Sequence, residues 1–159
     1  MDNFETISSV YKICWLENFD YSNQLVMQAS GFIFDDENNI LIVKSGKNWT
    51  IPGGHPEPNE NNYIDTLLRE VMEEASVTIK DIKYLGSVKV LDCDNNKNLP
   101  QTYYQLRYFA KIDKILPFST EWETSERKFV PLNELINYIT WSNGITFSKQ
   151  LECAKKNLK

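Results

Sequence analysis

Residues 54–77, GHPEPNENNYIDTLLREVMEEASV, contain the pattern that decides how this chain folds. Apolar residues recur at helical spacing through the second half of this stretch: Ile64, Leu67, Leu68, Val71 and Ala75. The periodicity predicts a helix over residues 63–75 that buries one apolar stripe. Asn62 precedes this helix and suits the N-cap, because its side chain can accept a hydrogen bond from a backbone N–H of the first turn.

Three glutamates lie on the same predicted helix: Glu70, Glu73 and Glu74, at positions i, i+3 and i+4. This spacing places the carboxylates on one face, away from the apolar stripe and toward solvent. Their mutual repulsion is roughly 0.2–0.5 kcal/mol per neighbouring pair. Mg²⁺ prefers oxygen ligands and substrate phosphates, so the face is a sensible platform for magnesium. Taken alone, such a triplet is more typical of a solvated acidic surface.

The residues before the helix favour the metal interpretation. Gly53 and Gly54 follow a short predicted strand, and glycines let the backbone approach a ligand or metal closely. Glu57 and Glu60 follow in a proline-containing loop. Arg69, beside the carboxylates, can pair with Glu60 and hold this loop against the helix. The glycine pair by itself is typical of a plain turn.

The whole stretch resembles the Nudix box, G-x5-E-x7-R-E-U-x-E-E-x-G-U, in which U is a bulky aliphatic residue. Eight residues match this pattern: Gly54, Glu60, Arg69, Glu70, Val71, Glu73, Glu74 and Val77. Residues 49–53, Trp-Thr-Ile-Pro-Gly, also resemble the segment that leads into the box. The box covers residues 54–77, and the remainder of the chain resembles the family only in the order of its elements.

Two features depart from the family pattern. Eight residues rather than seven separate Glu60 from Arg69, which leaves open how these two side chains meet. Ser76 replaces the glycine at the end of the box. Because a glycine at this place relieves a left-handed cap, Ser76 predicts a different exit from the helix.

The resemblance implies an α/β fold, an α/β/α sandwich with a mixed β-sheet. It also implies hydrolysis of the diphosphate bond in a nucleoside diphosphate linked to another moiety. Mg²⁺, with Mn²⁺ as an alternative, would be held by Glu70, Glu73 and Glu74. The cation would polarise the phosphoryl oxygens and lower the pKa of the attacking water.

Further residues of the box are assigned supporting roles by the same resemblance. The carbonyl of Gly53 or Gly54 and the side chain of Glu57 would add metal ligands. Arg69 and Glu60 would orient the carboxylates that bind the metal.

The general base would come from the box or from a late loop ahead of a short strand, as in many family members. Glu121, Glu123 and Glu126 stand just before residues 129–131. Glu123 is our choice, because its offset from the following aromatic residue resembles that in MutT-like members. Glu73 is the alternative within the box, and three glutamates in one loop are more typical of a solubilising surface.

Substrate contacts are less clearly marked in the sequence. His55 follows the glycine pair, where its ring can donate a hydrogen bond to phosphate. An aromatic face for a base could come from Trp49, Trp122, Tyr103 or Tyr104, although each is more typical of a core residue. Candidate phosphate contacts are Lys44, Lys47 and Arg107, with no stronger signal than ordinary surface charge.

The remaining elements are expected at both sides of the box. Residues 4–18 have apolar residues at roughly helical spacing, with a strand as the alternative. Further strands are expected at 24–34 and 40–43 as a hairpin, then at 49–51, 84–91, 103–112 and 129–130, with a polar loop over 92–100. Helices are expected at 132–139 and 146–158. We interpret residues 1–159 as a single domain with helices covering a mixed sheet.

Composition narrows the class of protein. The 159 residues carry a net charge of −5, so no broad basic surface is expected and a nucleic-acid partner is not favoured. Three cysteines with no CxxC unit fit a reducing cytosol. With no membrane-length apolar run and no basic, apolar leader, we expect a cytoplasmic protein without a membrane partner, monomeric or homodimeric.

Three functions remain open at this stage. The first is a hydrolase acting on a small-molecule nucleotide, and the second is a non-hydrolytic Nudix-fold regulator that binds a nucleotide. The third is an RNA 5′-end pyrophosphohydrolase. We favour the hydrolase because Glu70, Glu73 and Glu74 are all present, and binding modules of this fold usually lose these carboxylates.

Overall fold

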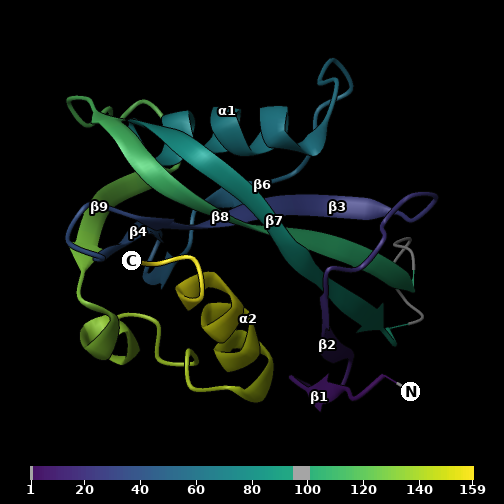
Figure 1. The fold of residues 1–159 in the computed structure, drawn as a ribbon. Helices are drawn as coiled ribbons and strands as arrows, with labels where there is room; N and C mark the ends of the chain where they lie inside the picture. Colours follow the sequence, from purple (N-terminus) through teal and green to yellow (C-terminus); the bar gives the residue numbers. More distant parts are fainter. Residues whose placement is uncertain (1, 95–100) are drawn as a thin grey trace.

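A twisted β-sheet forms the middle of the molecule, with helix α1 on one side and helix α2 on the other (Figure 1). The computed structural model describes residues 2–94 and 101–159. The strands are β1 (Glu5–Thr6), β2 (Tyr11–Glu17), β3 (Val26–Phe34), β4 (Ile40–Ser45), β5 (Asn48–Thr50), β6 (Gly53–Gly54), β7 (Val77–Asp92), β8 (Thr102–Ile115) and β9 (Thr124–Val130). The helices are α1 (Tyr63–Ala75), the 3₁₀ helix η1 (Leu132–Asn137) and α2 (Ile145–Lys155).

The sheet is mixed, as the sequence predicted. Its order is β1-β2-β7-β8-β3-β4-β5, with β6 attached to β3 and β9 to β4. The pair β3–β8 is parallel and the other strand pairs are antiparallel. With helices on both faces, this confirms the α/β/α sandwich.

Each face of the sheet carries its own apolar core. On the α1 side, Leu67, Val71 and Ala75 pack with residues of β3, β4, β7 and β8. On the α2 side, Phe147 and Ala154 pack with Phe32, Phe34 and other residues of the same strands. The two cores hold α1 and α2 in fixed positions relative to β3, the strand that pairs with the glycine pair of β6.

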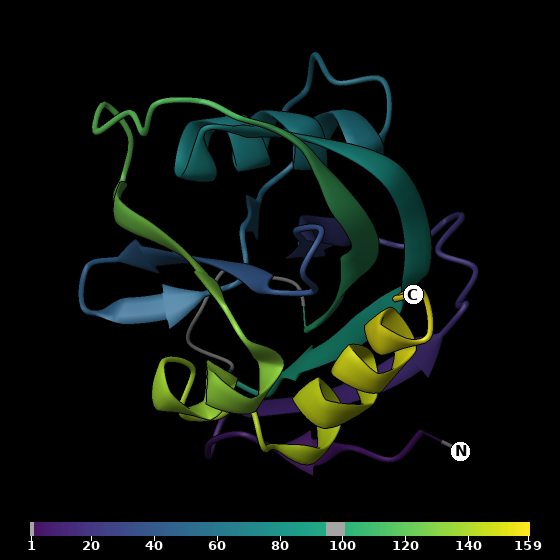
Figure 2. The same ribbon diagram turned by 60° about the vertical axis from the view of Figure 1, so that its left-hand side comes forward.

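The N-terminal segment differs from its first interpretation. Residues 11–17 form strand β2, which pairs along its length with β7, from Tyr11 opposite Asp92 to Glu17 opposite Gly86. The helical interpretation of residues 4–18 is therefore wrong, and the strand alternative is confirmed. Pairing with β7 outweighed the local apolar spacing. Figure 2 shows β1 running beside the start of α2, where Glu5 accepts a hydrogen bond from the backbone N–H of Thr146 at 2.8 Å.

Other expected elements shift in length rather than in type. The strands expected at 84–91 and 103–112 lie within the longer β7 and β8. The expected helix 132–139 is a 3₁₀ helix, Leu132–Asn137. Most of the expected polar loop over 92–100 lies outside the described residues. Within residues 2–94 and 101–159, no helix is long and apolar enough to cross a membrane.

Helix α1 is turned relative to the stripe that its apolar residues predict. Its buried residues are Thr66, Leu67, Val71 and Ala75. Ile64 and Leu68, both expected to be buried, are instead about 39% and 40% exposed. This orientation brings Glu70 and Glu74 toward the sheet. Glu70, Glu73 and Glu74 are all half-buried, so the three carboxylates reach solvent only in part.

Candidate active site

The glycine pair brings the sheet edge into contact with helix α1. In β6, Gly53 pairs with Ser30 and Gly54 with Ala29. A Cβ on Gly53, whose φ is +155°, would overlap Ser30, and a Cβ on Gly54 would overlap the carboxylate of Glu70. Only glycine allows this approach of the backbone to the helix.

Glu74 is joined to this glycine pair. The backbone N–H of Gly53 donates to Glu74 Oε1 at 2.7 Å. Burial raises the pKa of Glu74 to about 7, the bond from Gly53 opposes this rise, and the charges of Glu70, Glu123 and Glu73 add to it. Burial also raises the pKa of Glu70, against the lowering effect of Arg69. Negative charge at both positions is therefore unfavourable unless a cation compensates it.

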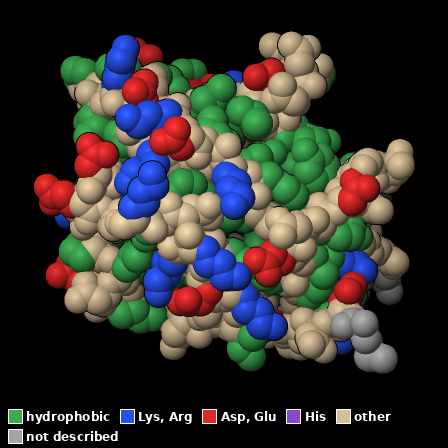
Figure 3. Space-filling model, in the orientation of Figure 1, with side chains coloured by type: hydrophobic (Ala, Val, Ile, Leu, Met, Phe, Trp, Pro, Cys, Tyr) green, Lys and Arg blue, Asp and Glu red, His purple; other side chains and the backbone are tan. Residues whose placement is uncertain are grey.

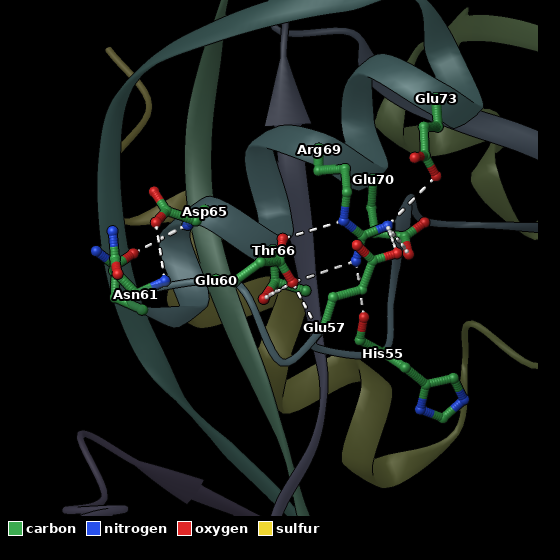
Figure 4. Close-up of polar contacts among 10 residues, drawn as sticks. His55, Glu57, Glu60, Asn61, Asp65, Thr66, Arg69, Glu70 and Glu73 are labelled. Carbon is green, nitrogen blue, oxygen red and sulfur yellow. Dashed lines mark hydrogen bonds and ion pairs between the residues drawn. The ribbon is translucent and has the colours of Figure 1, made fainter.

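Arg69 is the centre of the polar contacts in the box (Figure 4). Its Nε donates to Glu60 at 3.0 Å, and its Nη1 donates to Glu70 at 2.8 Å and to Glu73 at 3.3 Å. Its Nη2 donates to the carbonyl of His55 at 2.8 Å. The expected pairing of Glu60 with Arg69 is thus confirmed, and the extra loop residue does not prevent it.

Glu60 also holds its own loop in place. Its Oε1 accepts hydrogen bonds from the backbone N–H of Glu57 at 2.6 Å and from the hydroxyl of Thr66 at 3.0 Å. Hydrogen bonding to Arg69 keeps the pKa of Glu60 below its usual value, so this carboxylate stays charged. Glu57 lies 3.6 Å from Arg69 Nη1 and remains exposed.

Both ends of α1 are capped. Asn62 Oδ1 accepts from the N–H of Asp65 at 2.9 Å, which confirms the expected N-cap. Ser76 adopts the left-handed conformation itself, with φ 55° and ψ 44°, and its N–H donates to Met72 O. The expectation of a different helix exit is wrong, because a serine here takes the conformation that a glycine would have relieved.

Glu123 is positioned by its neighbour. The buried Thr124 donates through its hydroxyl to the carbonyl of Glu74 at 2.6 Å. Glu123 itself is exposed, and its charge is close enough to raise the pKa of Glu74. Glu126, in contrast, lies in β9 and pairs with Lys44 at 3.7 Å. Of the three late glutamates, Glu123 is the one whose charge acts on the box.

The carboxylates have free oxygens suited to a cation. Glu70, Glu73 and Glu74 each use one oxygen in the contacts above, and the second oxygen has no hydrogen-bond partner in the described part of the chain. Among residues 2–94 and 101–159, no three acidic, histidine or cysteine side chains already surround one point. Arg69 Nη1 bridges Glu70 and Glu73.

The expected substrate contacts lie in different places. His55 is exposed, its Nδ1 lies 2.6 Å from Met27 O, and its ring points away from Arg69 in Figure 4. Trp49 packs edge-on against Tyr138 at 5.6 Å between ring centroids. Tyr104 stacks on Phe19, and Trp122 is exposed.

A cavity of about 700 Å³ begins at Gly53 and extends across the α2 face of the sheet. Trp49 is not among its lining residues, whereas Tyr103 and Arg107 are. Its lining includes three glutamines that the sequence interpretation missed: Gln28, Gln105 and Gln150. A signal was present, because Gln28 and Ser30 alternate with apolar residues on β3, as Gln105 and Arg107 do on β8, which places each pair on one face of its strand.

The chain is similar to known proteins over most of its length. Residues 25–149 match the family described as NUDIX domain. A Bacillus subtilis (strain 168) protein named as a candidate 8-oxo-dGTP diphosphatase, YtkD, is 34% identical over 87 residues. That match covers 54% of this chain and 49% of the relative, so it spans about half the relative's length.

Two solved structures show the same fold. The Bacillus subtilis pyrophosphohydrolase BsRppH, solved as a mutant, aligns with a TM-score of 0.74 and 21% identity, covering 94% of each chain. The NUDIX domain of Shewanella oneidensis NrtR, complexed with ADP ribose, aligns with a TM-score of 0.63 and 19% identity. That alignment covers 89% of this chain and 95% of the other.

Proposed function

The chain belongs to the NUDIX domain family, and on that premise we propose that it hydrolyses the diphosphate bond of a nucleoside diphosphate linked to another moiety. The observation that carries this proposal is the contact between the glycine pair and two half-buried carboxylates, Glu70 and Glu74. Burial makes their negative charge unfavourable, and a bound cation would reverse that penalty.

The residues present fit a hard divalent cation, which the family typically uses. All available donors are oxygens, the ligand type that Mg²⁺ and Mn²⁺ prefer. Glu70, Glu73 and Glu74 would hold the ion, with Glu57 and the Gly54 carbonyl as further ligands. When bound, the cation would polarise the phosphoryl oxygens, offset the charge of the leaving phosphate and acidify the attacking water.

The chain's own side chains have distinct tasks in this proposal. Arg69 holds one oxygen of Glu70 and one of Glu73, which leaves the second oxygen of each directed elsewhere. Glu60 fixes Arg69 from the other side. Glu123 accepts the proton of the attacking water, because it is the exposed carboxylate that Thr124 holds beside Glu74.

A panel of substrates tests the proposal. Nucleotide sugars, dinucleoside polyphosphates and nucleoside triphosphates are incubated with Mg²⁺, and products are separated by chromatography. We expect turnover that EDTA stops and added Mg²⁺ restores. Tight binding of one nucleotide without turnover of any would instead support the non-hydrolytic regulator.

Basic and acidic side chains are interspersed on the face in Figure 3, so that face offers no continuous basic surface for RNA.

Replacing Glu123 with glutamine tests the general base. Glutamine keeps the size of the side chain but cannot accept the proton, so kcat is expected to fall by about 10²- to 10⁴-fold. The affinity for Mg²⁺, measured by titration calorimetry, is expected to stay within a few-fold. Glu121→Gln in the same exposed loop is the matched control. An unchanged rate in Glu123→Gln would move the base to Glu73 or Glu126.

A further inference from the structure

Four polar side chains form one cluster on the floor of the cavity: Arg107, Gln28, Gln105 and Gln150. The parallel strands β3 and β8 place Gln28 opposite Gln105 and Ser30 opposite Arg107. On its other side Ser30 pairs with Gly53, so Arg107 lies two strand spacings, about 10 Å, from the glycine pair, and Gln28 lies on the strand between them. One bound nucleotide can therefore contact both the glycine pair and this cluster.

Arg107 has only neutral partners in this cluster. Its Nε donates to Gln150 Oε1 at 3.0 Å, its Nη1 to Gln28 Oε1 at 2.9 Å and to Leu106 O at 3.2 Å, and its Nη2 to Gln105 Oε1 at 3.0 Å. No ion pair of Arg107 with a carboxylate occurs among the described residues. Holding a half-buried cation without an anion is costly, which points to a role beyond packing.

Hydrogen bonding to Arg107 fixes the orientation of the three glutamine amide groups. A guanidinium can only donate, so each glutamine must direct its oxygen toward it and its amide nitrogen away. The amide of Gln150 donates to Thr146 O at 3.2 Å. The amide nitrogens of Gln28 and Gln105 have no partner in the described part of the chain, and both side chains line the cavity. The floor therefore offers two amide groups as donors, held in fixed orientation.

Apolar side chains form much of the rest of the cavity lining, with Glu5, Thr50 and Asn143 as polar members. Its walls include Ile13, Ile51, Val88, Val90 and Phe147. A volume of about 700 Å³ is typical of a site for a small molecule. A phosphate at the floor would need the fork of the arginine, and four of its five N–H groups are already bonded within the protein. A flat heterocycle with acceptors on one edge suits both the walls and the floor.

We propose that Gln28 and Gln105, oriented by Arg107, select a 6-oxopurine base by donating to its O6 and N7 atoms. A 6-aminopurine presents a donor at the first of these places, and it would face another donor. This inference rests on the function proposed above, since it treats the cavity as the base site of the same substrate. It names the substrate class of the site as guanine-type or hypoxanthine-type nucleotides.

Binding of mononucleotides tests the base choice without any hydrolysis. GMP, IMP, AMP and UMP are titrated into the protein in EDTA and followed by calorimetry or by tryptophan fluorescence. We expect GMP and IMP to bind alike and AMP at least about 10-fold more weakly, since IMP keeps the O6 and N7 acceptors of GMP and AMP carries an amino group in place of O6. Equal binding of AMP, tighter binding of UMP, or no binding of any of the four would overturn the inference.

If GMP and IMP bind more tightly than AMP but no guanine or hypoxanthine diphosphate derivative is hydrolysed, the proposed function is wrong and this inference is supported. If adenine and guanine substrates are hydrolysed with equal kcat/KM, the proposed function is supported and this inference is wrong. The two proposals therefore fail by different results.

Two variants sharpen the test. Gln105→Glu gives Arg107 a carboxylate partner and directs an acceptor oxygen into the cavity, as does Gln28→Glu on the neighbouring strand. In each, the ratio of GMP to AMP affinity is expected to fall by about 10- to 100-fold. Gln24→Glu, at an exposed position, carries the same charge change as a control. An unchanged ratio of GMP to AMP affinity in both pocket variants overturns the inference. If Gln105→Glu does not fold, the result for Gln28→Glu decides.

Discussion

Replacing Glu74 with glutamine is expected to lower kcat by about 10²- to 10⁴-fold, because the loss of a charged metal ligand removes several kcal/mol of transition-state stabilisation. The fold is expected to persist. Glutamine keeps the oxygen that accepts from the backbone N–H of Gly53, so the contact between β6 and α1 is retained. The rate is measured with saturating substrate over a range of Mg²⁺ concentrations.

The same variant is expected to be more stable than the natural protein when no metal is present. Burial raises the pKa of Glu74 from 4.5 to about 7 in the folded state. Between these pH values the folded chain holds more protons than the unfolded chain, so the free energy of unfolding falls as pH rises through this window. Because solvent screens the partly exposed Glu74, the free energy of unfolding is expected to fall by about 1–3 kcal/mol across this window.

Denaturant unfolding in EDTA measures this effect. At pH 8 the free energy of unfolding of Glu74→Gln should exceed that of the natural protein by about 1–3 kcal/mol. Near pH 4.5 the two free energies should agree, because Glu74 is then protonated in the folded protein. Glu37→Gln, in an exposed turn, serves as the control. Near-normal turnover of Glu74→Gln would show that Glu74 is not a metal ligand.

Replacing Gly54 with alanine is expected to lower kcat/KM by about 10²-fold, the size of effect that a misplacement of about 1 Å can cause. The new Cβ would overlap the carboxylate of Glu70, which must swing away and give up its 2.8 Å bond to Arg69. Gly54 has no positive φ, so its backbone accepts alanine. The stability cost is then that of a displaced side chain, about 0.5–1.5 kcal/mol.

Gly46→Ala provides the opposite case. Gly46 has φ +60° and nothing within 4 Å of an added Cβ, so alanine strains only the backbone. Stability should fall by roughly 1–2 kcal/mol while kcat/KM stays unchanged. If kcat/KM of Gly54→Ala fell no further than its smaller folded fraction explains, the close approach of Gly54 to Glu70 would have no part in catalysis.

The orientation of α1 connects these expectations. Leu68 and Met72 are left partly exposed while Glu70 and Glu74 turn toward the sheet. Burial of Leu67, Val71 and Ala75 fixes one face of the helix against the sheet. The bond from Gly53 to Glu74 and the bond from Thr124 to the Glu74 carbonyl add polar contacts that hold the carboxylates in this orientation.

The sequence alone was sufficient to predict the local unit of the site. Asn62 caps α1 and Arg69 reaches Glu60, as expected, because these partners lie within one short segment whose helix sets their spacing. The choice of Glu123 among three glutamates followed from its offset to the next aromatic residue. The charge of Glu123 helps to raise the pKa of Glu74, and its role as the general base stays a prediction.

Long-range pairing decided the remainder. Residues 11–17 became a strand because β7 pairs with them, and apolar spacing along the chain carries no information about such a partner. Gln28, Arg107 and Gln150 come from β3, β8 and α2, and they meet only because the register of two strands and the packing of α2 bring them together. The sequence thus determined the family and its carboxylate helix, whereas the tertiary structure decided which face of that helix is buried and which side chains line the cavity beside it.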